Sequence, residues 1–184
     1  MGQAIAICGH ICSGKSEIIN YLSHEHGWNV ISFGSYVKYV AQDECLPATR
    51  DSYQTLGQKL FKERGPKQFL LDVIEFHGPT SLTHLFDGVR HTLIIDELRQ
   101  MYAGLFVVYL HVSDAVRYER FLKRRKENEP LLSVAEFLRL SEHPIEKGIS
   151  DIAGVADQSI DASVPLAQVL AEIKSPLERQ NLLV

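Results

Sequence analysis

The residues whose spacing most clearly predicts chemistry lie close together, in the segment GHICSGKS near the start of the chain. This segment matches the pattern G-x-x-x-x-G-K-[ST] in full. Glycines in such a loop allow backbone amides to surround phosphate oxygens, because no side chain stands in the way. The lysine supplies positive charge to the β- and γ-phosphates, and the serine hydroxyl can ligate Mg²⁺. The spacing therefore predicts binding of ATP or a related triphosphate, with Mg²⁺, through Gly9, His10, Ile11, Cys12, Ser13, Gly14, Lys15 and Ser16.

A carboxylate at the end of an apolar segment is the second feature with predicted chemistry. Asp87 closes the segment THLFD and is followed by Gly88. On a strand, this carboxylate would face the phosphate loop and could hold Mg²⁺ through water. The same pair of residues would also suit a simple Asp-Gly turn. Because the phosphate loop is present, we interpret Asp87 and Ser16 as the metal-binding residues.

Basic residues are concentrated in one short segment of a mildly acidic chain. They are Arg117, Arg120, Lys123, Arg124, Arg125 and Lys126. Arg117, Arg120 and Arg124 are spaced three and four apart, so they share one face of a helix. Such a run is usually a solvated face, but phosphoryl transfer needs positive charge on the phosphate oxygens in the transition state. We therefore predict that Arg120 and Arg124 are catalytic, together with Lys15 and Asp87.

The hydrophobic pattern predicts the elements that must position these residues. Short apolar segments that suit buried strands alternate with amphipathic helical segments. The expected strands are 3–8, 28–33, 83–87, 105–112 and 157–161. The expected helices are 13–26, 34–41, 51–64, 66–77, 92–102, 114–128, 133–140 and 164–174. This order predicts an α/β fold of three layers, with a five-stranded parallel sheet and helices on both faces, and the phosphate-loop motif after the first strand makes it the P-loop NTPase fold.

Length and composition restrict the classes of protein that remain. The chain has 184 residues and a formal net charge of −4, which suits a single compact domain and argues against nucleic acid as a partner. No apolar run reaches the ~20 residues needed to span a membrane, and the first residues lack the pattern of a signal peptide. The three cysteines show no paired spacing, which argues against zinc and favours reduced thiols. We expect a cytoplasmic protein, either a monomer or a homodimer.

At these motifs the sequence resembles the P-loop nucleoside and nucleotide kinases, which include adenylate kinase and dephospho-coenzyme A kinase. The segment FDGVR, residues 86–90, is similar to L-D-G-F-P-R of adenylate kinases, in which the aspartate supports Mg²⁺ and the arginine binds the acceptor phosphate. The segment ISFGS, residues 31–35, lies where those kinases have an S-T-G-D acceptor segment. The resemblance implies an acceptor site that contains Gly34, Ser35, Lys38, Arg50 and Arg90.

The carboxyl-terminal half is more similar to dephospho-coenzyme A kinase. Residues 119–124 resemble the arginine pair of that family, residues 139–143 its lid R-I-x-x-Q, and residues 156–161 its A-D-x-V-I-x-N strand. The segment D-x-P-L-L-F-E, which marks that family, is absent. The combination is most similar to the dephospho-coenzyme A kinase-like nucleotide kinases of archaea and phages. The resemblance implies a substrate contact from Arg139 and adenine contacts from Ser163 and Pro165.

These features predict a single kinase domain, residues 1–184, that transfers the γ-phosphoryl group of ATP to a small acceptor similar to a nucleoside monophosphate. A phosphate acceptor needs no strong general base, because its oxygen is already anionic near neutral pH. The acceptor-binding insert is expected at about 34–80, and a lid that excludes water at about 126–150. Three alternatives stay open: hydroxyl phosphorylation of the dephospho-coenzyme A type, a non-catalytic ATP-binding sensor, and a 5′-hydroxyl kinase acting on nucleic acid.

Overall fold

The computed structural model describes residues 2–78, 83–124, 131–142 and 144–179. At its centre lies a sheet of five parallel strands in the order β2-β3-β1-β4-β5. The strands are β1 (Gln3–Gly9), β2 (Asn29–Ser32), β3 (Thr83–Asp87), β4 (Gly104–His111) and β5 (Gln158–Asp161). Every residue of β1 after Gln3 is buried, as expected for a central strand covered on both faces.

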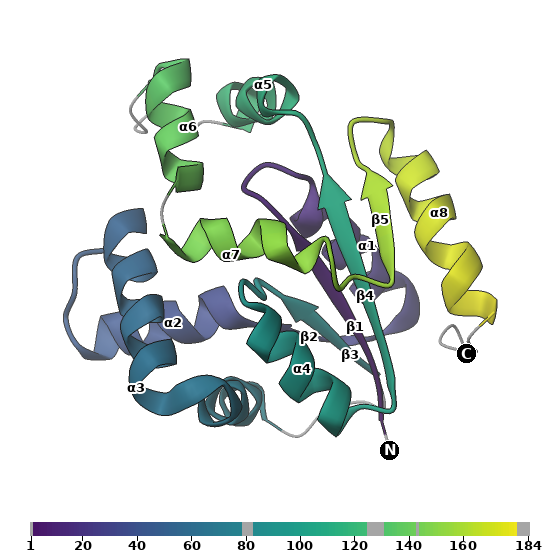
Figure 1. The fold of residues 1–184 in the computed structure, drawn as a ribbon, viewed down its shortest axis with the longest axis horizontal. Helices are drawn as coiled ribbons and strands as arrows, with labels where there is room; N and C mark the ends of the chain where they lie inside the picture. Colours follow the sequence, from purple (N-terminus) through teal and green to yellow (C-terminus); the bar gives the residue numbers. More distant parts are fainter. Residues whose placement is uncertain (1, 79–82, 125–130, 143, 180–184) are drawn as a thin grey trace.

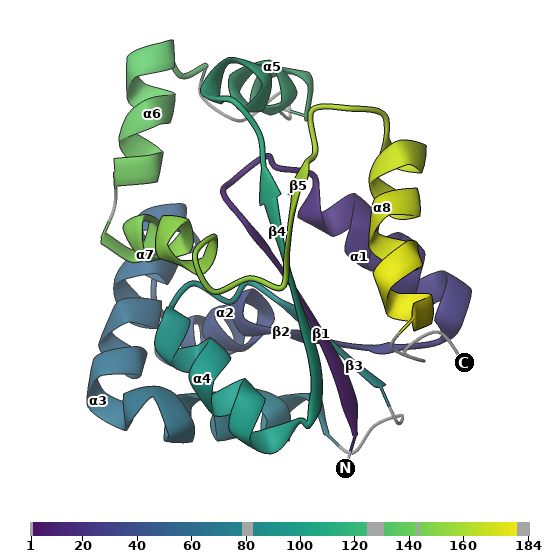
Figure 2. The same cartoon turned by 45° about the vertical axis from the view of Figure 1, so that its right-hand side comes forward.

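Helices cover both faces of the sheet, which confirms the predicted three-layer P-loop fold. They are α1 (Lys15–His26), α2 (Phe33–Asp43), α3 (Arg50–His77), α4 (Thr92–Met101), α5 (Asp114–Arg124), α6 (Val134–Glu142), α7 (Pro144–Ile152) and α8 (Leu166–Arg179). Figure 2 shows α1 and α8 on one side of the sheet, and α2, α3, α4 and α7 on the other. Within the described ranges, no helix has both the length and the apolar character needed to cross a membrane.

Successive residues of β1 supply the two hydrophobic cores in turn. Ala4 and Ala6 contribute to a core shared with α2, α3, α4 and α7, whereas Ile5 and Ile7 contribute to one shared with α1 and α8. Because side chains alternate along a strand, each core receives every second residue. The carboxyl ends of β1, β2 and β3 are thereby held next to one another, and α5 and α6 lie beyond the strands at that end (Figure 1).

Several boundaries differ from those expected from the sequence. Phe33, expected at the end of a strand, begins α2, because the hydroxyl of Ser32 accepts a hydrogen bond from the amide of Ser35 and caps this helix. The break expected between the helices 51–64 and 66–77 is confirmed, because α3 consists of two helical parts on either side of Gly65, whose φ of 73° and ψ of 164° are not helical. The expected helix 114–128 is described as far as Arg124, and its remainder lies outside the described residues.

Helix α7 is the element that the sequence analysis did not predict. All but its last two residues fall inside the segment of about 126–150 that we expected to form a lid, together with α6 and residues outside the described part. Two of its side chains, Ile149 and Ile152, are buried in the core shared with α2, α3 and α4. The carboxyl-terminal half of α7 is therefore anchored in the domain, and any lid movement is proposed only for the segment before that anchor.

Candidate active site

The candidate site lies at the carboxyl ends of three neighbouring strands. The phosphate loop follows β1, and Asp87 ends β3, where it is paired in register with Ile7 of β1 and Ser32 of β2. The hydroxyl of Ser32 donates a hydrogen bond of 3.4 Å to Oδ2 of Asp87. A cavity of about 770 Å³ joins the phosphate loop, Asp87 and side chains from α2, α3, α5 and α7. This is the expected place for a ligand in an open parallel sheet.

The glycines of the phosphate loop are required by its geometry. Gly9 has a φ of +147°, and a Cβ atom there would lie 2.7 Å from the carbonyl oxygen of Leu110. Gly14 has a φ of +96° and immediately precedes α1. Both conformations are accessible to glycine and strained for other residues. The loop is therefore shaped as the spacing predicts, with the amino-terminal end of α1 directed at its centre.

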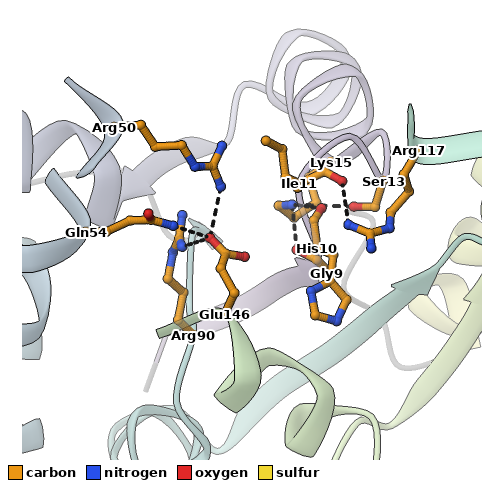
Figure 3. Close-up of polar contacts among 10 residues, drawn as sticks. All are labelled: Gly9, His10, Ile11, Ser13, Lys15, Arg50, Gln54, Arg90, Arg117 and Glu146. Atoms are coloured by element: carbon orange, nitrogen blue, oxygen red, sulfur yellow. Dashed lines mark hydrogen bonds and ion pairs between the residues drawn. The ribbon is translucent and has the colours of Figure 1, made fainter. Parts of the chain in front are cut away.

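Lys15 folds back into the phosphate loop. Its ammonium group donates hydrogen bonds to the carbonyl oxygens of Gly9, at 2.6 Å, and His10, at 2.8 Å, as drawn in Figure 3. Burial lowers the pKa of Lys15 to about 8, against the opposing attraction of Asp87. The amine is thus held among backbone carbonyls at the position where phosphate oxygens would bind it more strongly.

The arginines of α5 fall into two groups by position. Arg120 donates hydrogen bonds to the carbonyl oxygens of Ser13, at 3.2 Å, and Ala162, at 2.6 Å, and both Arg120 and Arg124 line the cavity. Arg117 is buried instead, with its guanidinium 5.6 Å from the centre of the Phe137 ring. It joins α5 to α6 and to the phosphate loop, where Nη1 contacts the carbonyl oxygen of Ile11 at 3.4 Å.

Of the other three basic residues of the predicted cluster, Lys123 also lines the cavity, and Arg125 and Lys126 lie outside the described residues.

On the opposite wall of the cavity, two arginines converge on one buried carboxylate. Nη2 of Arg50 and Nε2 of Gln54 each lie 3.1 Å from Oε1 of Glu146, and Nη1 of Arg90 binds the same oxygen. Figure 3 shows these side chains facing the phosphate loop. Glu146 is 1% exposed. Burial raises the pKa of its carboxyl, but the charges of Arg90 and Arg50 outweigh this effect and hold the pKa below its ordinary value.

Sequence reasoning placed Arg50 and Arg90 in one site but missed Glu146 and Gln54. Glu146 is separated from its arginine partners by 96 and 56 residues, so no local pattern could pair them. A weak signal for α7 itself was available: Pro144 is a favourable first helical residue, and Ile149 and Ile152 are three residues apart on one helical face.

An apolar wall completes this side of the cavity. Its members come from α2, α3, α4 and α7, and they are Phe33, Val37, Tyr53, Phe61, Phe69, Ile94 and Ile149. The ring of Phe61 stacks on that of His91, with centroids 4.1 Å apart and an angle of 15°. A ligand here would meet positive charge at one point and flat apolar surface beside it.

The other predicted binding residues are distributed unevenly. Gly34 and Lys38 line the cavity. Ser35, Arg139, Ser163 and Pro165 are exposed and lie outside its lining. Ser163 and Pro165 follow Ala162 in the turn after β5, so Arg120 connects that turn with the phosphate loop. Whether these four residues contact a ligand stays a prediction.

The residues expected to hold Mg²⁺ line the same cavity. Ser16 offers a hydroxyl and Asp87 a carboxylate, and both border the space in front of Lys15. In the described part of the chain, no cluster of three or more His, Cys, Asp or Glu side chains is arranged to hold a metal by itself. A sparse set of oxygen ligands suits Mg²⁺, which keeps several waters and takes others from phosphate.

The strand order, the phosphate loop after β1 and the arginine-lined cavity beside it define a P-loop protein of the kinase-like class. The chain belongs to the AAA_18 family, because the model of that family, described as an AAA domain, matches residues 5–136. The resemblance to P-loop kinases drawn from the motifs is thereby confirmed.

Known proteins similar to the chain cover nearly its whole length. A UPF0200 protein from Pyrococcus abyssi is 26% identical in an alignment of 165 residues that covers 85% of this chain and 85% of that one. A gluconokinase from Sinorhizobium meliloti 1021 has a TM-score of 0.62 at 21% identity, with 97% of this chain and 93% of that one covered. A shikimate kinase from Bacteroides thetaiotaomicron has a TM-score of 0.59 at 16% identity, with 98% and 99% covered. At these identities the solved structures show a shared fold.

Proposed function

We propose that the protein is a small-molecule kinase that transfers the γ-phosphoryl group of ATP to an acceptor resembling a nucleoside monophosphate. One observation carries the proposal: a single cavity contains both the phosphate loop and a second set of cationic and aromatic side chains. A protein that only sensed ATP would not need a second ligand chamber that opens onto the triphosphate. We call the part around the phosphate loop the donor end, and the part around Arg50 and Arg90 the acceptor end.

At the donor end, the proposed roles follow from the positions of three side chains. Lys15 would leave the carbonyl oxygens of Gly9 and His10 and bind the β- and γ-phosphates. Ser16 and Asp87 would hold Mg²⁺, which when bound neutralises charge that develops on the phosphates. The hydrogen bond from Ser32 supports this role for Asp87, because it fixes one carboxylate oxygen and orients the group.

Arg120 and Arg124 are proposed to stabilise the transition state. The Nη1 atom of Arg120 lies 3.5 Å from where a Cβ on Gly14 would be, so its charge is beside the loop that would bind the phosphates. Its two hydrogen bonds to backbone carbonyl oxygens hold the guanidinium in place before any substrate arrives. Such preorganised charge lowers the barrier because it needs no reorganisation during the reaction.

The acceptor end suits a molecule with an anionic group and a flat apolar body. Arg50 and Arg90 would bind the anionic group, because guanidinium groups match phosphate oxygens in both charge and geometry. Lys38 would add charge at the rim, and the aromatic wall would pack against a base. A nucleoside monophosphate meets both requirements.

A hydroxyl acceptor, as in the dephospho-coenzyme A type of reaction, is the second candidate. The specific observation in its favour is that the cavity holds another carboxylate near Arg50 and Arg90, that of Glu146, besides Asp87, and a hydroxyl acceptor needs a proton acceptor within reach. In this case Asp87 would bind Mg²⁺ and Glu146 would accept the proton, so Asp87 would not need to do both.

The experiment that tests the proposal is a coupled assay of ADP release with ATP and Mg²⁺. The acceptor panel contains nucleoside monophosphates, dephospho-coenzyme A, nucleosides and a short 5′-hydroxyl oligonucleotide, with a reaction lacking acceptor as the control. The expected result is release that a nucleoside monophosphate stimulates, with a diphosphate as the second product. Stimulation by dephospho-coenzyme A or a nucleoside alone would favour the hydroxyl candidate. If no acceptor raises the rate above that of the control, the small-molecule kinase proposal is wrong.

A further inference from the structure

The carboxylate of Glu146 binds its partners at the acceptor end through one of its two oxygens. Arg50, Gln54 and Arg90 all bind one atom, its Oε1 oxygen, although a carboxylate distributes its charge over two. Among the described residues, no hydrogen bond to Oε2 is found. Figure 3 shows this second oxygen on the side of the phosphate loop. The carboxylate therefore presents a free oxygen to the cavity that both ends share.

The position of this carboxylate matches the position where an acceptor anion would bind. A phosphate oxygen would be bound by the same guanidinium N–H groups that now bind Oε1. Two anions at hydrogen-bonding distance from the same donors repel each other strongly in a partly buried site. An acceptor anion that binds these N–H groups therefore has to displace Glu146 from them.

We infer that Glu146 is a specificity-determining residue, an internal competitor that the anionic group of the acceptor must displace from Arg50 and Arg90. The inference rests on the proposed function only for the identity of the acceptor. A phosphate dianion gains more from two arginines than a carboxylate of charge −1 does, so it displaces Glu146. A carboxylate-bearing molecule has no such advantage, and a neutral one leaves Glu146 in place. The site thus selects phosphorylated molecules.

The helix that carries Glu146 is built so that this displacement is local. Glu146 lies near the amino-terminal end of α7, whereas Ile149 and Ile152 anchor the other end in the core. Between them Gly148 packs closely on the loop after β3, where a Cβ atom would lie 2.7 Å from the carbonyl oxygen of Arg90. Glu146 can therefore withdraw by a change in its side chain or in the first turn, while α7 keeps its place in the core.

The test compares the binding of inorganic phosphate to the wild-type protein and to Glu146→Gln by titration calorimetry. Glutamine keeps the shape of the side chain and removes its charge, so the arginines are no longer held by a competing anion. We expect the dissociation constant for phosphate to fall about tenfold, as it would if Glu146 occupied the arginines about nine-tenths of the time. Once an acceptor is known, its KM should fall with it, while the KM for ATP stays unchanged.

Other outcomes overturn the inference. If Glu146 only holds the arginines in place, Glu146→Gln weakens phosphate binding and raises the acceptor KM. If Glu146 is the proton acceptor of a hydroxyl substrate, kcat falls while phosphate binding is unchanged. Glu142→Gln, on the exposed surface of α6, is the matched control and should alter none of these quantities.

A second variant tests the same inference without removing the charge. Gly148→Ala places a methyl group against the carbonyl of Arg90 and should shift α7, and with it Glu146, away from the arginines. We expect tighter phosphate binding here too, by about threefold. This variant decides the matter if Glu146→Gln does not fold, and weaker or unchanged binding would contradict the inference.

The calorimetric readout needs no turnover, so the two proposals can fail separately. Tighter phosphate binding by Glu146→Gln without acceptor-dependent ADP release would refute the kinase proposal alone. Acceptor-dependent ADP release with unchanged phosphate binding would refute only the inference that Glu146 competes with the acceptor.

Discussion

At the donor end of the cavity, apart from Asp87 and the arginines of α5, the ligand-binding groups come from one short stretch of chain, and Gly9 and Gly14 give that stretch its shape. At the acceptor end, they come from α3, the loop after β3, and α7, which are far apart in sequence. The charges differ as well. Lys15 is held by neutral carbonyl oxygens, whereas Arg50 and Arg90 are already paired with a carboxylate.

The difference indicates how each end is prepared for its ligand. At the donor end, the buried ammonium group of Lys15 is hydrogen-bonded to neutral carbonyl oxygens. The negative charge of a triphosphate would stabilise it more strongly. The acceptor end has its charges satisfied, and a ligand must first break an ion pair. Substitutions at the donor end should therefore abolish function, whereas a well-chosen substitution at the acceptor end should strengthen binding.

The largest effect is expected for Lys15→Ala. Removal of the charge that binds the β- and γ-phosphates should lower kcat about a thousandfold, because electrostatic stabilisation of the charge on the transferring phosphates is usually the largest single contribution. The measurement is acceptor-dependent ADP release at saturating substrates. Lys59→Ala, an exposed position on α3, serves as the control. A rate within tenfold of wild type would show that the donor end does not depend on Lys15.

The pH dependence of stability provides the next test, because it reports the cost of burying the charge of Lys15. The pKa of Lys15 is about 8 in the folded protein and 10.5 ordinarily, so the unfolded chain binds more protons between these values. Stability should consequently rise with pH across that window and lose this gain as pH falls through 8. The contribution is on the order of 3 kcal/mol. Urea unfolding of wild type and Lys15→Met at pH 7 and pH 10.5 isolates it, and parallel pH profiles would contradict the prediction.

A smaller effect, on the free energy of unfolding, is expected when the backbone shape of the phosphate loop is changed without a change in charge. Gly9→Ala brings a Cβ atom against the carbonyl oxygen of Leu110, at a φ of +147°, and should reduce the free energy of unfolding by about 2 kcal/mol or more. Gly27→Ala is the matched control, because its φ is +64° but no atom lies within 4 Å. That variant should lose only about 1 kcal/mol. Equal losses in urea unfolding would mean that close packing around Gly9 contributes nothing.

The same contrast explains what could be predicted from the sequence. The phosphate loop is local: its function depends on eight consecutive residues, so its spacing alone identified it. The strands were recognisable because burial on both faces leaves a continuous apolar run, as in residues 4–8, and Gly65 with Pro66 marked the kink in α3.

What escaped prediction at the acceptor end depends on tertiary contacts. Glu146 is an ordinary surface residue by sequence and becomes the centre of the acceptor end only because α7 packs beside α4 and β1. Phe33 has high strand propensity, yet it starts α2 because Ser32 caps the helix there. The partners of Glu146 are invisible to a local pattern, whereas the Ser32 cap is local, between residues 32 and 35, and was outweighed by the strand propensity of Phe33.

The smallest effect is expected at Arg139, which the resemblance places in a lid and the structure leaves exposed on α6. Helix α6 is tied to the donor end through Phe137, which is fully buried and packs against Phe121 of α5. We expect Arg139→Ala to lower kcat by about fivefold at most, since an exposed charge contributes up to ~1 kcal/mol. The binding of ATP alone, measured by calorimetry, should stay within twofold, because any closure of α6 would follow binding of both substrates. A larger loss in ATP binding than in kcat would instead place Arg139 on the triphosphate from the start and extend the donor end to α6.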